Sequence, residues 1–170
     1  MIETLKIILL CIAAAILYGI IHDQFTARIC IEYFTIFHPP VFPTQSPTLL
    51  GIGWGIIATW WMGAFLGTLL AIAARAGSRP VLSATQLVRP IGKLLVLMAA
   101  TATLFGFAGF VSARYGIISS PPWLASQLSI PAQSRFMADW WAHTSSYVSG
   151  AAGGIVLCVM TYRKRNHPQR

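Results

Sequence analysis

The chain of 170 residues is too apolar for a protein whose surface faces water: 56% of its residues are hydrophobic and 9% are charged, against about 25% charged in typical soluble domains. Its net charge of +8 would suggest nucleic acid in a soluble protein, but here the basic residues flank apolar runs. We therefore expect the lipid bilayer as a partner and no nucleic acid.

Four apolar runs are long enough to cross a bilayer. The hydrocarbon core is about 30 Å thick and takes about 20 helical residues. The runs cover approximately residues 5–21, 49–74, 91–110 and 136–162. The sequence therefore predicts an all-α integral membrane protein, in which residues 1–170 form a single domain of four transmembrane helices.

The first run begins MIETLKIILLCIAAA and shares an apolar stretch and small residues with signal peptides. Its preceding charge is weak because Glu3 offsets Lys6, and the apolar stretch continues past the alanines to Ile21. We therefore predict an uncleaved membrane anchor.

Lys and Arg residues are concentrated on one side of the predicted bundle. With four spans, the first residues, the loop over 75–90 and the last residues share that side, which holds nine of the twelve basic residues. Cytoplasmic flanks of membrane proteins carry such an excess, so we predict both termini in the cytoplasm and the chain in a bacterial inner membrane. The nine are Lys6, Arg75, Arg79, Arg89, Lys93, Arg163, Lys164, Arg165 and Arg170, and the other three are Arg28, Arg114 and Arg135.

The segment 22–48 follows the first span and lies outside the cytoplasm in this topology. His22 and Asp23 come directly after the apolar run. β-Branched and aromatic residues then alternate in ARICIEYFTIF, which favours extended chain over residues 28–35. Prolines make the following stretch irregular, since proline lacks a backbone donor. We predict a short extended or irregular cap over the outer mouth of the bundle.

A second polar group lies at the start of the fourth span, after an outer loop over 111–135. Arg135, Asp139, His143 and Tyr147 follow one another at steps of four, close to one face of a helix. Counting back about 20 residues from Tyr162 places His143 at the outer boundary of the bilayer. The Asp139 carboxylate could orient the imidazole or share a metal with it. The alternative is an ion pair between Arg135 and Asp139.

Three of the four acidic residues and three of the four histidines therefore share the outer face. Imidazole and carboxylate groups are ligands of Zn, Mn and Fe(II), and such sites take three or four of them. No HExxH or similar spacing accompanies them. The six residues form a candidate metal or polar cluster, supported by Thr26, Arg135 and Tyr147: they are His22, Asp23, Glu32, His38, Asp139 and His143.

Residues 18–80 resemble a group of small bacterial multi-span membrane proteins. The pattern HDxxTxxxxxEYFT, which runs from His22 to Thr35, and the following HPP carry the resemblance. It implies a bacterial multi-pass protein whose signature is this segment. No activity of that group is established, so the resemblance implies no catalytic role for any residue.

Small residues recur at a four-residue spacing in the second and fourth spans. This spacing lets helix backbones approach closely in lipid. We expect it to serve packing within one bundle, with a homo-oligomer interface as the alternative. The positions are Gly51, Gly55, Gly63, Gly67, Gly150 and Gly154.

The sequence leaves three classes of function open. It contains no nucleophile elbow, phosphate-binding loop or nucleotide fingerprint, which favours a non-enzymatic membrane component that binds a membrane-protein partner. The alternative is a divalent-metal site that binds its ion or hydrolyses a lipid-borne or peptide substrate. A small oligomeric channel or carrier comes third, because no ionisable residue lies at the centre of a span.

Overall fold

The computed structural model describes residues 1–165, and every regular element within them is helical. In chain order the elements are α1 (Ile2–Ile29), the π-helical turn η1 (Tyr33–Phe37), α2 (Pro47–Ile57), α3 (Trp60–Arg75), α4 (Ala84–Arg114), the short α5 (Pro122–Ala125) and α6 (Ile130–Lys164). Within residues 1–165, four helices, counting α2 and α3 as one, are long and apolar enough to cross a membrane. By length and composition the chain is thus a multi-pass membrane protein, as predicted.

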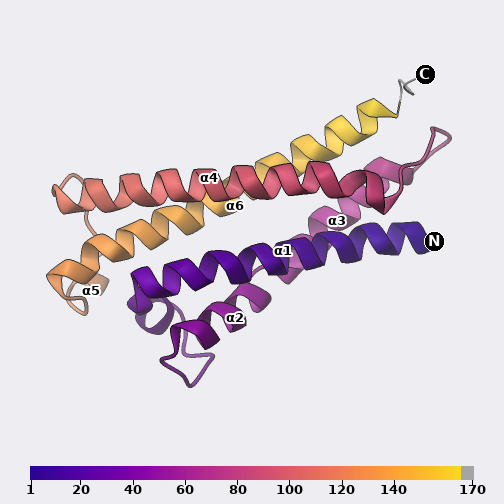
Figure 1. The fold of residues 1–170 in the computed structure, drawn as a ribbon. Helices are drawn as coiled ribbons and strands as arrows, with labels where there is room; N and C mark the ends of the chain where they lie inside the picture. The colour runs from indigo at the N-terminus through magenta and orange to yellow at the C-terminus, as the bar shows by residue number, and fades with distance from the viewer. Residues whose placement is uncertain (166–170) are drawn as a thin grey trace.

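The helices form two layers that face each other (Figure 1). One layer pairs α1 with α2 and α3, and the other pairs α4 with α6. The start of α1, the α3–α4 connection and the end of α6 lie at one end of the bundle, here called the terminal end (Figure 1). The opposite end, here called the cap end, holds η1, the segment 38–46 and α5 (Figure 1).

The predicted extended segment over residues 28–35 is wrong. Helix α1 continues to Ile29, and after Cys30 the chain forms η1. Cys30, Tyr33 and Phe34 are buried, each 6% exposed or less, and their spacing of three and four residues is that of a helix face. Burial of this face explains the helical turn, while the segment 38–46 that follows carries no regular structure.

Two helices also begin before their apolar runs do. Helix α4 starts at Ala84, where Ser83 and Gln86 form a capping box and the Glu3 carboxylate accepts the Ala84 N–H at 3.2 Å. Helix α6 starts at Ile130 with Pro131 in its first turn, a position that needs no backbone donor. The connection between α4 and α6, residues 115–129, is therefore shorter than the 111–135 predicted for the outer loop.

The second span is interrupted between α2 and α3. The Thr59 hydroxyl donates to the Gly55 carbonyl at 2.6 Å, a contact to the preceding turn that often bends helices. Ala58 and Thr59 at this break both line the interior of the bundle. The neighbouring Trp60 and Trp61 are about half exposed on the outside.

Glycines bring α2 and α3 directly against α1. A Cβ atom added at Gly55 would collide with the backbone of Ile20, and one at Gly63 would lie 2.8 Å from the Cys11 carbonyl oxygen. Gly51 and Gly67 face α1 in the same way. In α6, by contrast, a Cβ added at Gly150 or Gly154 would meet only side-chain atoms. The flexible side chains of Met98 and Leu66 occupy the space next to these two glycines.

The terminal end is closed by Arg165. Its guanidinium is buried, with the residue 2% exposed, and donates to backbone carbonyls at the end of α3 and in the loop after it. The acceptors are the carbonyls of Ala73, Ala76, Arg79 and Pro80, at 2.7–3.1 Å. Cations suit the carbonyl end of a helix, so Arg165 fixes the end of α6 against α3.

Candidate metal site

Three of the six candidate ligands converge in the structure. His22 and Asp23 near the end of α1 meet His143 of α6, and one ligand atom from each lies within 4.8 Å of the others. His22 is about 30 Å along α1 from Ile2, and His143 is about 30 Å along α6 from Lys164, at 1.5 Å per residue. This span equals one hydrocarbon thickness, and the cluster lies that far from the terminal end of the bundle, toward the cap end.

The hydrogen bonds of His143 define which atoms face the cluster. Its Nδ1 lies 2.8 Å from the Asp139 carbonyl oxygen, which only accepts, so Nδ1 carries a proton. Its Nε2 lies 3.2 Å from Asp23 Oδ1. In a neutral imidazole this Nε2 holds a lone pair, which then faces a carboxylate oxygen. Two such acceptors need a shared proton or a cation between them.

Two residues of α1 and α6 carry further buried polar atoms without a partner. His22 Nε2 and both carboxylate oxygens of Asp139 are buried and have no hydrogen-bond partner in the described part of the chain. Asp139 is 0% exposed. Buried polar atoms in folded proteins are nearly always satisfied by protein, water or an ion, so the unpartnered His22 Nε2 is a candidate ligand atom at the cluster.

Aromatic rings hold the two imidazoles in place. The Tyr18 ring stacks on His22 with centroids 5.7 Å apart, and the Tyr33 ring of η1 stacks on His143 at 4.4 Å. The two imidazoles meet edge to face at 4.6 Å. Tyr18 is itself held by a 2.7 Å hydrogen bond to Ser146. The helical turn η1, which forms where extended chain was predicted, therefore positions one wall of the site.

The ion pair between Arg135 and Asp139, the alternative drawn from sequence, does not form. Arg135 is exposed, and no salt bridge within residues 1–165 involves it. Each step of four residues rotates a side chain by about 40° around a helix of 3.6 residues per turn. Over twelve residues the rotation is about 120°, which leaves Asp139 and His143 inside while Arg135 and Tyr147 turn outward. Tyr147, 44% exposed, still touches the interior pocket.

Glu32 and His38 lie outside the converging group. Glu32 accepts the Cys30 thiol at 3.3 Å. His38 binds the Tyr33 carbonyl through Nδ1 at 2.7 Å and packs on the Trp54 ring at 4.6 Å. Burial lowers the pKa of His38, and burial together with the charges of Asp139 and Glu32 raises the pKa of Cys30 to about 12. The His38 imidazole and the Cys30 thiol are thus neutral groups at the cap end.

Thr26 has a structural role beside the cluster. Its hydroxyl donates back to the His22 carbonyl at 3.3 Å, and the residue is 3% exposed. It therefore satisfies the backbone of the residue that supplies one candidate ligand.

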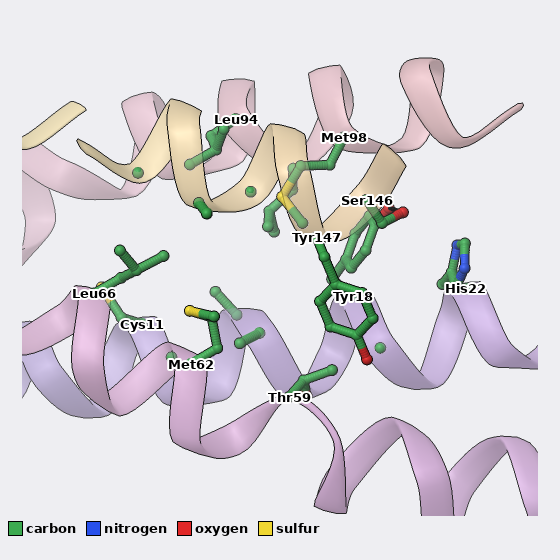
Figure 2. A pocket seen from close by; sticks show the side chains of 18 of the residues that line it. Cys11, Tyr18, His22, Thr59, Met62, Leu66, Leu94, Met98, Ser146 and Tyr147 are labelled. Atoms are coloured by element: carbon green, nitrogen blue, oxygen red, sulfur yellow. Dashed lines mark hydrogen bonds between the residues drawn. The ribbon is translucent and has the colours of Figure 1, made fainter. Parts of the chain in front are cut away.

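A pocket of about 120 Å³ extends from the cluster into the bundle between the two helix layers. Figure 2 shows His22, Tyr18 and Ser146 near one end, with Cys11, Leu66 and Leu94 toward the other. Met62 and Met98 point into it from opposite layers (Figure 2). The candidate ligands therefore stand at the polar end of an otherwise apolar pocket.

Sequence reasoning missed Tyr18, Tyr33 and Ser146. Tyr18 lies four residues before His22 and Ser146 three residues after His143, spacings that place each on the same helix face as its histidine. That signal was available in the sequence. The stacking of Tyr33 on His143 depends on the turn η1 and had no such signal.

Comparisons with known proteins do not assign the chain to a family. No protein-family model, no curated protein and no solved structure matches it. The class of protein therefore rests on the fold and the site: a multi-pass membrane protein with a buried His/Asp cluster.

Proposed function

We propose that the protein binds a divalent transition-metal ion through His22, Asp23 and His143. The observation that supports this most directly is the meeting of His143 Nε2 with Asp23 Oδ1 beside His22. The groups come from two helices 120 residues apart in sequence. A cation bound to both atoms would replace the proton of their 3.2 Å hydrogen bond and would supply the partner that the buried His22 Nε2 lacks in the described part of the chain.

The ligand set fits zinc first, with manganese and iron(II) as alternatives. Zinc takes imidazole and carboxylate ligands, and catalytic zinc sites use three protein ligands and keep one position for water or substrate. A metal at such an open position lowers the pKa of bound water and supports hydrolysis. A set of three protein ligands thus favours a hydrolytic centre over a closed structural site, which would have four protein ligands.

We further propose that the site opens on the extracytoplasmic side of a bacterial inner membrane. The basic residues gather at the terminal end of the bundle, where α3 and α6 end with Arg75, Arg163 and Lys164. The positive-inside rule places that end in the cytoplasm. The cluster, one hydrocarbon thickness away along α1 and α6, then faces outward.

Metal content of the purified protein tests the proposal. Protein in detergent, loaded with zinc and freed of excess ion, should carry about one zinc per chain by elemental analysis, a stoichiometry set by a single three-ligand site. His22→Ala and His143→Ala should each lose the metal. His38→Ala is the matched control, because His38 is a partly buried histidine of the same cap but outside the cluster.

Two results would contradict different parts of the metal proposal. If the wild type binds no zinc, manganese or iron(II) at micromolar concentrations, the metal proposal fails. If His38→Ala loses the metal as completely as His143→Ala while eluting as a monodisperse species, the ligand assignment is wrong.

A structural component that binds a partner is the second candidate. Large apolar side chains stay exposed at the cap end, including Tyr115 at 78%, Ile117 at 74% and Ile130 at 83%. They could contact a membrane-protein partner or a second copy of the chain. Wild-type protein that carries no metal and purifies as a stable oligomer would favour this candidate.

A further inference from the structure

The pocket beneath the cluster is long compared with its volume. Its walls run along α1 from Cys11 to Asp23 and along α6 from His143 to Leu157, which corresponds to about 18–21 Å of helix. Yet the pocket holds only about 120 Å³. A pocket of this extent and volume suits one unbranched chain.

The lining is polar at only one end. Beyond the cluster and the hydroxyls of Tyr18, Tyr147, Ser146 and Thr59, the walls consist of hydrocarbon and sulfur: they include Leu66, Leu70, Ile91, Leu94, Leu95 and Leu157. Apolar cavities of comparable size stay dry and bind apolar molecules. Water is therefore a poor occupant of the deep end, while an alkyl chain would bury its surface there.

The walls can also adapt to a chain. Met62 and Met98 enter the pocket from opposite layers (Figure 2), and methionine side chains are flexible enough to fit irregular shapes. The nearest atoms to a Cβ at Gly150 are the Met98 methyl carbon, at 2.9 Å, and its sulfur, at 3.4 Å. One wall is thus a glycine surface covered only by a movable side chain.

We propose that this pocket binds the unbranched aliphatic chain of a membrane amphiphile, whose polar head lies against His22, Asp23 and His143. The placement of the head rests on the proposed metal function, whereas the binding of the chain rests on the pocket alone. It identifies the substrate class of the site as a single-chain or acylated lipid. The bilayer supplies such molecules at the depth where the pocket lies.

Photo-crosslinking tests the proposal. The probe is palmitic acid with a diazirine at its methyl end, added to the purified protein in lipid nanodiscs, and crosslinked residues are mapped by mass spectrometry. We expect labels at the deep end of the pocket, on Cys11, Leu66, Leu94 or Leu157. Labels confined to the lipid-facing side chains of α4, such as Leu97 and Phe107, would overturn it.

A pair of variants controls for the fold. Gly150→Leu places a side chain in the pocket and should cut deep-end labelling by about tenfold, the effect of losing one decade in affinity. Gly92→Leu makes the same change where nothing lies within 4 Å of a Cβ and should label like the wild type. Equal deep-end labelling of both variants would also overturn the proposal.

The metal and the chain can fail separately. Deep-end labelling in a protein that binds no metal would sustain chain binding and remove the proposed metal function. Stoichiometric metal binding without deep-end labelling would sustain the proposed metal function and remove chain binding. Loss of the metal from His143→Ala, with its remaining labels still at the deep end of the pocket, is the result expected if both proposals hold.

Discussion

At the scale of single residues, His143 connects most of the features of the site. Its Nδ1 is bound to its own helix at Asp139, its Nε2 points to Asp23 of α1, and its ring lies against Tyr33 of η1. The backbone bond fixes the tautomer, a role that carbonyl oxygens often play for metal-bound histidines. Contacts with α6, α1 and η1 therefore hold this imidazole in one orientation without a bound ligand.

Cys30 offers a test of how tightly the cap closes. The residue is 1% exposed, and its pKa is raised to about 12 by burial and by the charges of Asp139 and Glu32. Since the thiolate is the reactive form, a Cys11→Ser/Cys158→Ser variant should react with maleimide at pH 8 at least about a hundredfold slower when folded than in SDS.

The control for this measurement is a thiol placed on the surface. Ser126→Cys in the same background lies on the exposed turn after α5 and should react quickly in the folded protein. Fast labelling of Cys30 without unfolding would show that η1 does not cover it.

At the scale of elements, the region after α1 shows why periodicity misled the prediction. Apolar residues in ARICIEYFTIF alternate, but Ala27, Cys30, Phe34 and Phe37 also recur at helical spacing. Both patterns were present, and short apolar stretches do not distinguish them. Packing of the helical set against Leu124, Ala132 and Phe136 of the cap end decides the outcome, and these partners are remote in sequence.

The contact between α1 and α2 depends on the absence of a side chain at Gly55. Because a Cβ there would collide with the Ile20 backbone, Gly55→Val should force the helices apart and destabilise the fold by about 1–3 kcal/mol, the usual cost of overpacking. Thermal unfolding in detergent, followed by tryptophan fluorescence, measures the effect.

Gly92→Val provides the comparison on α4. It introduces the same β-branched side chain into a helix, but with nothing within 4 Å of the new Cβ. Its melting temperature should stay close to that of the wild type. If both variants melt alike, the loss reflects helix propensity and not the α1–α2 contact.

At the scale of the whole molecule, the sequence predicted the number of spanning helices and their all-helical class, because long apolar runs have few other solutions in a bilayer. It could not predict which candidate ligands would meet. The spacing from Asp139 to His143 places both on one face of α6, but the direction in which that face points depends on how α6 packs against α1. Asp23 and His143 meet, while Glu32 and His38 turn into the cap.

The orientation of the bundle determines which compartment would supply the proposed metal, and it can be tested directly. If the terminal end is cytoplasmic, a green fluorescent protein fused to the C-terminus should fluoresce in bacterial cells. Alkaline phosphatase fused after Gly116, in the turn that follows α4, should be active, since it folds only outside the cytoplasm. The opposite pattern for both reporters would invert the bundle. The His22–Asp23–His143 cluster would then draw its ion from the cytoplasm, while the metal and chain proposals, which depend on local geometry, would stand unchanged.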